Sequence, residues 1–139
     1  MPYCVVTSNV AKASVDESAA LRLLSQAVAT ALGKPESYVM VQLNLSTPML
    51  FQATDEVWTL QSERVRLLGL GSICSHGTMI PCAMIALRSI GKIDAESNAK
   101  TAALLTETIS KALNVPAGRI IMNFDDIARS NWAMGGRTF

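Results

Sequence analysis

One residue at the start of the chain could do acid–base chemistry, namely Pro2, which directly follows Met1. Cellular aminopeptidases remove an initiator methionine when the next residue is small, and the new terminus would be the secondary amine of Pro2. An α-amino group has a pKa of about 7.7–8.0, and burial in apolar surroundings lowers that pKa further. Such an amine suits a general base at neutral pH. Taken alone, however, the first ten residues favour the plainer interpretation, in which Pro2 only begins a strand.

Cysteine and histidine could instead bind a metal or carry redox chemistry. The cysteines are Cys4, Cys74 and Cys82, and no two of them form a Cys-x-x-Cys pair. Cys74 lies near His76 in a glycine-rich stretch, but two ligands are too few for a zinc site. An odd number of cysteines without a secretory leader indicates reduced thiols in a cytoplasmic protein. We therefore predict neither a metal nor a cofactor.

The composition excludes several classes of protein. The chain has 139 residues, of which 50% are hydrophobic and 17% are charged, and its net charge is +1. This balance argues against disorder and gives no basic surface for nucleic acid. Residues 67–87 carry no Asp, Glu, Lys or Arg, but their glycines and Pro81 predict a loop and a strand, not a membrane span. We expect one domain with a substantial core.

A βαβ unit is predicted at the start of the chain. Residues 2–8 are apolar and β-branched, as in a buried strand, and Ser14 with Glu17 forms a capping box for a helix that stops at Gly33. Residues 38–45 then alternate in polarity like a half-buried strand. The apolar face of the helix consists of Leu21, Leu24, Val28, Ala31 and Leu32.

The same unit recurs in the second half of the chain. Residues 31–35 (ALGKP) match residues 112–116 (ALNVP), residues 83–89 form the second opening strand, and Asp94 can cap the second helix. Two βαβ repeats predict an α+β fold, a four-stranded mixed sheet with both helices on one face. The other face would be left apolar and uncovered, which favours an oligomer.

One segment lies outside the repeat. Residues 57–80 have no clear period and several glycines, so we predict a single domain, 1–139, with an atypical insert at 57–80. A long surface loop costs little closure entropy, although apolar residues such as Trp58 are unusual in one. The insert could be a lid, a partner-binding segment or the product of a retained intron.

Several dispersed motifs in a fixed order are more specific than any one of them. They are Met1-Pro2, Gly33-Lys34-Pro35, Tyr38-Val39-Met40, Pro81-Cys82-Ala83, Ser89-Ile90-Gly91-Lys92-Ile93, Asn123-Phe124 and Thr138-Phe139. Through them the chain resembles the macrophage migration inhibitory factor family of the tautomerase superfamily over nearly its whole length, residues 57–80 excepted. The resemblance implies a homotrimer whose sheets surround a central channel. It also implies that Pro2 is the catalytic base for keto–enol tautomerisation of small aromatic substrates such as phenylpyruvate or dopachrome, which reverses the plainer interpretation of Pro2.

The resemblance also assigns the remaining site residues. Lys34 would place a cation near the substrate's carboxylate or developing enolate, where charge stabilisation is most effective. Ser89 and Ile90 would form the wall beside Pro2, and Asn123 would come from the neighbouring subunit. The other substrate-binding positions that it implies are Tyr38, Ile121, Trp132, Met134 and Phe139.

One departure from the family pattern leaves a second function open. Ile121 stands where well-studied members have a tyrosine that touches substrate, which puts affinity for aromatic substrates in doubt. The alternative is a cytokine-like protein with a weak or vestigial tautomerase site. It would be secreted without a signal peptide and would bind a cell-surface receptor on a host or target cell. Retained Pro2 and Lys34 favour the enzyme, whereas Ile121 and the insert favour the alternative.

Overall fold

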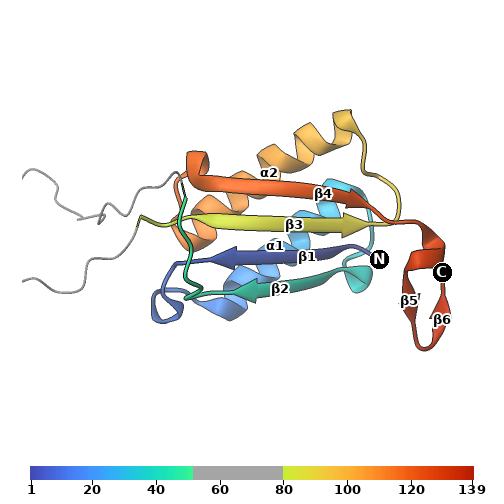
Figure 1. Ribbon diagram of the computed structural model, residues 1–139, viewed down its shortest axis with the longest axis horizontal. Helices are drawn as coiled ribbons and strands as arrows, with labels where there is room; N and C mark the ends of the chain where they lie inside the picture. Colours follow the sequence, from blue (N-terminus) through green and yellow to red (C-terminus); the bar gives the residue numbers. More distant parts are fainter. Residues whose placement is uncertain (52–79) are drawn as a thin grey trace, which may run out of the picture.

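A four-stranded mixed sheet forms one layer of the protein, and two helices cover one of its faces (Figure 1). The computed structural model describes residues 1–51 and 80–139. The strands are β1 (Tyr3–Ser8), β2 (Met40–Asn44), β3 (Ala83–Ser89) and β4 (Ile120–Asp126), in the order β2-β1-β3-β4. β1 is parallel to β2 and β3 is parallel to β4, whereas β1 and β3 are antiparallel. The predicted α+β fold is confirmed.

Alternation along the strands places the core between the sheet and the helices α1 (Glu17–Leu32) and α2 (Ala95–Leu113). In β3, for example, Ile85 and Leu87 are fully buried, whereas Met84 and Arg88 are exposed. This alternation is the signature of a strand with one covered face. The buried residues that meet there include Cys4, Val6, Leu24, Val28, Leu32, Ile85, Leu87, Leu105, Ile109 and Leu113.

The internal repeat extends to backbone conformation. α1 ends at Gly33 and α2 ends at Asn114, and both residues have the left-handed conformation, with φ of 59° and 52°. Two residues after each of them stands a proline, Pro35 or Pro116, which directly precedes the short helix η2 (Glu36–Tyr38) or η3 (Ala117–Arg119). A left-handed C-cap followed by proline stops a helix and turns the chain back to the sheet. Both units thus close in the same way.

Two details of the predicted elements are wrong. Asp16, not Ser14, caps α1, because the Asp16 carboxylate accepts a hydrogen bond of 3.0 Å from the Ala19 amide. Ser14 belongs instead to the short helix η1 (Lys12–Ser14), where its hydroxyl donates to the Ala11 carbonyl. β2 also begins at Met40 and not at residue 38, because η2 holds Tyr38 outside the strand.

Nothing in residues 1–51 and 80–139 covers the second face of the sheet, and this face is not uniformly apolar. Met84 and Ile121 are exposed there. Nearer the other end of β3, the Tyr3 hydroxyl donates to Gln42 at 2.5 Å, and Arg88 pairs with Asp125 at 3.2 Å. Part of this face is therefore a polar surface whose groups already have partners.

The C-terminal segment extends past the sheet as a small hairpin (Figure 1). The short helix η4 (Arg129–Asn131) leads into β5 (Ala133–Met134) and β6 (Arg137–Thr138). The turn between these strands needs two positive φ angles, which Gly135 and Gly136 supply with 60° and 81°. The hairpin lies at the end of the sheet where the chain begins.

The insert falls almost entirely outside the described residues. At its end, Ile80 accepts a hydrogen bond from Asn9, which follows β1. No helix in residues 1–51 and 80–139 is long and apolar enough to cross a membrane.

Candidate active site

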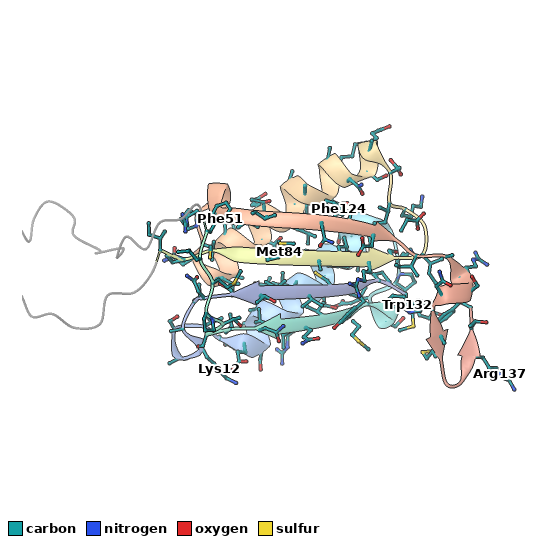
Figure 2. The ribbon with its side chains drawn as sticks, in the orientation of Figure 1. Lys12, Phe51, Met84, Phe124, Trp132 and Arg137 are labelled. Atoms are coloured by element: carbon teal, nitrogen blue, oxygen red, sulfur yellow. The ribbon has the colours of Figure 1, made fainter. Side chains whose placement is uncertain are left out.

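A cavity of about 510 Å³ lies at the end of the sheet where β1 and β2 begin and β3 and β4 end. Segments from four parts of the chain meet there. Because β1 and β2 run antiparallel to β3 and β4, the starts of the first two strands and the ends of the other two lie at the same end of the sheet. The lining residues are Met1, Lys34, Pro35, Tyr38, Ile90, Arg129 and Phe139. Figure 2 shows Trp132 at this end of the sheet and Phe51 at the opposite end.

Pro2 lies between Met1, which lines the cavity, and the first residue of β1, Tyr3. Its side chain is fully buried, and its carbonyl accepts a hydrogen bond of 3.0 Å from the Met40 amide, which fixes it beside β2. Met1, bonded to the Pro2 nitrogen, lines the cavity. Removal of Met1 therefore leaves the Pro2 nitrogen as the terminal amine, at the cavity.

Lys34 brings a cation to the same cavity. Gly33 ends α1 in the left-handed conformation, and the next residue, Lys34, points its ammonium group across to the loop after β3. The Lys34 Nζ donates to the Ser89 Oγ at 2.8 Å and to the Ile90 carbonyl at 2.7 Å. Burial lowers the pKa of Lys34, the negative charge of Asp126 opposes that change, and the positive charge of Lys92 adds to it.

The loop after β3 is held in place by the end of β4. Gly91 and Lys92 both have positive φ, 69° and 66°, and the Gly91 amide donates to the Asp126 carboxylate at 2.8 Å. The Ile127 amide donates to the carbonyl of the buried Ser89 at 2.9 Å. These bonds fix the carbonyl of Ile90 that receives the Lys34 ammonium.

The N-terminal amine is tuned towards the neutral form. The pKa of this amine, which belongs to Met1 in the unprocessed chain, is lowered first by burial and second by the positive charge of Lys34. Pro2 is more deeply buried than Met1. Because burial disfavours the charged form of an amine, a terminal Pro2 amine would feel the same two effects.

The fold agrees with comparisons to known proteins. A family model described as macrophage migration inhibitory factor matches residues 1–73 and 64–139. The chain belongs to the macrophage migration inhibitory factor family. It is 32% identical over 139 residues to a homolog from Brugia malayi and 32% identical to the factor of Rattus norvegicus, with 100% of this chain and 99% of each relative covered.

Solved structures of the macrophage migration inhibitory factor family show the same fold. The factor of Toxoplasma gondii superposes with a TM-score of 0.74 at 34% identity, with 99% of each chain covered. A homologue from Prochlorococcus marinus gives a TM-score of 0.75 at 27% identity, with 99% of this chain and 98% of that chain covered. The resemblance inferred from the motifs is thereby confirmed.

Six of the ten residues that the family resemblance assigned to the site meet at this cavity. Lys34, Tyr38, Ile90 and Phe139 line it. Pro2 follows the lining residue Met1, and Ser89 accepts a hydrogen bond from Lys34. The catalytic and binding roles of these residues stay predictions.

The other four residues do not line the cavity of their own chain. Ile121 and Asn123 are exposed on the uncovered face of β4, where Ile121 pairs in register with Met84. Met134 is exposed on the hairpin and Trp132 is half-buried beside it. For Asn123 this position agrees with the prediction that it serves a neighbouring subunit, and that prediction remains untested.

Arg129 is a lining residue that the sequence did not indicate. It belongs to η4, in the C-terminal tail where the resemblance assigned Trp132, Met134 and Phe139 to the site. The signal was an arginine in a short stretch that contains no acidic residue after Asp126, but nothing in that stretch alone places it at a cavity.

The thiols of the described residues are buried away from this chemistry. Cys4 is completely buried in the core, and burial raises the pKa of its thiol to about 12. Cys82 is also buried. Because a thiolate is the reactive form, the Cys4 thiol is inert at neutral pH. Residues 1–51 and 80–139 contain no cluster of three metal-binding side chains, and Cys74 and His76 lie outside the described residues.

Proposed function

We propose that the protein is a keto–enol tautomerase of aromatic 2-oxo acids such as phenylpyruvate, with the Pro2 amine as its catalytic base after Met1 is removed. The observation that carries the proposal is the position of Met1, which is bonded to the Pro2 nitrogen and lines the same cavity as Lys34. A base, a cation and apolar walls are what this proton transfer needs. Membership of the tautomerase superfamily supports the same chemistry.

The reaction requires one base and no cofactor. The Pro2 nitrogen takes a proton from the carbon next to the carbonyl, and the electrons of that C–H bond form the new C=C bond. The carbonyl electrons move onto the oxygen, which becomes an enolate. The Pro2 ammonium then returns its proton to that oxygen, so that the enol leaves and the amine is neutral again.

Lys34 stabilises the charge that forms on the oxygen. Its ammonium group donates two hydrogen bonds, to Ser89 and Ile90, and so keeps one N–H for the enolate. A positioned donor is most effective where charge develops during the reaction. Tyr38 and Phe139 would hold the aromatic ring of the substrate.

A homotrimer would complete the site. In the part of one chain that the structure describes, nothing covers the second face of the sheet, which carries the exposed Met84 and Ile121, and Asn123 does not line the cavity. A neighbouring subunit could cover this face and bring Asn123 to the cavity of the next chain. Light scattering should give three times the chain mass of 14.9 kDa, and a stable, active monomer would refute both ideas.

Substitution of Pro2 tests the function. Pro2→Gly leaves a processed chain with a primary amine, and we expect turnover of phenylpyruvate to fall severely while the oligomer mass is unchanged. Lys100→Met, on the exposed surface of α2, is the control for nonspecific effects of a substitution and should keep the wild-type turnover. Equal turnover by the wild type and Pro2→Gly would refute Pro2 as the base.

A cytokine-like role is the second candidate, and Ile121 is the observation that favours it. Ile121 is 45% exposed and does not line the cavity of its own chain, and its hydrocarbon side chain has no hydroxyl for a substrate. Ile121→Tyr should strengthen binding of hydroxyphenylpyruvate by about 0.5–1.5 kcal/mol if a neighbouring subunit brings position 121 to the site. If this variant gains nothing and the wild type has no measurable turnover, the binding role is favoured.

A further inference from the structure

Arg129 is the second cation at the cavity, and the site derived so far does not use it. The cavity lining contains Lys34 and Arg129 but, among the described residues, no aspartate or glutamate. Two basic side chains without an acidic side chain favour an anionic ligand. The question is which cation binds which part of it.

The existing hydrogen bonds distinguish the two cations. Two of the three ammonium N–H groups of Lys34 are already bound, to the Ser89 hydroxyl and the Ile90 carbonyl. None of the ion pairs within residues 1–51 and 80–139 includes Arg129. A guanidinium has five N–H donors in a planar fork that matches the two oxygens of a carboxylate.

The backbone holds Arg129 in place from both sides. Two residues before it, the Ile127 amide is bonded to the Ser89 carbonyl, in the loop that receives Lys34. After it, the Trp132 amide donates to the Arg129 carbonyl at 3.2 Å, and the Phe139 amide donates to the Trp132 carbonyl at 3.1 Å. These contacts link Arg129 both to the loop that holds Lys34 and to Phe139 of the cavity lining.

We propose that Arg129 binds the carboxylate of the substrate through paired hydrogen bonds and leaves Lys34 for the oxo oxygen that becomes the enolate. This inference rests on the proposed tautomerase function and assigns its substrate selectivity. Arg129 would make the enzyme select 2-oxo acids over the corresponding esters and simple ketones. Because Arg129 contacts the carboxylate and not the reacting carbon, it determines specificity, while Pro2 carries the proton.

Binding of an unreactive probe tests this assignment apart from catalysis. The probes are 3-phenylpropanoate, which has no oxo group to tautomerise, and its neutral amide, 3-phenylpropanamide, each titrated calorimetrically into Met1-processed protein. We expect Arg129→Gln to weaken binding of the acid by about 10- to 100-fold, as for hydrogen bonds to a charged group, and to leave binding of the amide unchanged. Arg129→Lys keeps the charge without the fork and should recover part of the loss.

Arg137 provides the matched control, since it lies in the same C-terminal segment as Arg129, outside the cavity lining, and points away from the sheet (Figure 2). Arg137→Gln should change binding of the acid by less than about twofold, because a screened surface charge contributes little. Equal losses in both variants, or equal losses for acid and amide, would overturn the proposal. So would a changed oligomer mass in Arg129→Gln, because Arg129 would then serve a subunit contact. A wild type that binds the acid through Arg129 but does not turn over phenylpyruvate would refute the tautomerase function instead.

Discussion

The Lys34 ammonium group donates a hydrogen bond of 2.7 Å to the carbonyl of Ile90, and this bond joins the two βαβ units at the cavity. Lys34 follows the helix of the first unit, whereas Ile90 follows the opening strand of the second. The hydrogen-bond acceptors of Lys34 are a hydroxyl and a carbonyl, so its charge is not neutralised by a directly bonded carboxylate. That charge is therefore available to the N-terminal amine and to a substrate.

Replacing Lys34 with methionine should move the acidic limb of the pH profile to higher pH. The positive charge of Lys34 lowers the pKa of the N-terminal amine, so its loss raises that pKa and leaves more amine protonated and inactive at a given pH. The rate itself should fall about 100-fold with the loss of an electrostatic donor. The measurement is kcat/KM for phenylpyruvate against pH, with Lys100→Met as control. A limb that stays in place or moves to lower pH would contradict this coupling.

Replacing Asp126 with asparagine should move the alkaline limb of the pH profile of kcat/KM to lower pH. The negative charge of Asp126 raises the pKa of Lys34, so the variant loses the Lys34 proton at lower pH, while its amide oxygen can still accept from the Gly91 amide. An NMR titration of the Lys34 side chain would show the lowered pKa. The matched control is Asp125→Asn, which removes the carboxylate that pairs with Arg88 and should leave the pKa of Lys34 unchanged. Equal shifts in both variants would point to a general charge effect.

Removing the cap of α1 should destabilise the fold. Asp16→Ala removes the acceptor of the Ala19 amide and should cost about 1 kcal/mol of unfolding free energy, the usual effect of losing an N-cap. Ser14→Ala should cost clearly less, because Ser14 is exposed and bonds only the nearby Ala11 carbonyl. Urea unfolding at one fixed protein concentration would compare them. A larger loss for Ser14→Ala would restore the capping box expected from sequence.

Deleting the insert should leave the core and the site intact. Phe51, before the insert, and Ile80, its last residue, lie at the end of the sheet opposite the cavity. The Phe51 carbonyl accepts from Arg119, before β4, and the Ile80 carbonyl accepts from Asn9, after β1. Joining residue 56 to Pro81 loses the bond between Asn9 and Ile80, about 0.5–1.5 kcal/mol.

The deletion variant keeps the bond of 2.8 Å from the Cys82 amide to Asn9. It should fold, keep the oligomer mass of the full chain and retain activity that depends on Pro2. Loss of the fold, or loss of activity at an unchanged oligomer mass, would show that the insert is structural or acts in catalysis.

Most of the fold could be predicted because the sequence contains the same βαβ unit twice. The repeat of ALGKP as ALNVP fixed where both helices end, and the structure shows the same left-handed residue at Gly33 and Asn114. The strand Ala83–Ser89 and the Asp94 cap were predicted at their observed positions. The cap of α1 was missed because Ser14 and Asp16 both suit an N-cap, and only the long-range course of the chain selects one.

The site could be predicted only in part, because the cavity forms where four distant segments meet. Pro2, Lys34 and Ile90 stand in motifs that a family resemblance can match. Arg129 stands in no such motif, and its position depends on the bond between Ile127 and Ser89, which links two strand ends. A local pattern of residue types carries no information about such a contact.

The state of the N-terminus tests the central claim most directly. The measurement is kcat/KM for phenylpyruvate with two forms of the wild-type chain, one beginning at Pro2 and one retaining Met1, with the terminus verified by mass spectrometry and equal oligomer mass confirmed. Because an acylated Pro2 nitrogen is an amide and not a base, the form that retains Met1 should be at least about 100-fold slower. Equal rates for the two forms would contradict the assignment of Pro2 as the catalytic base.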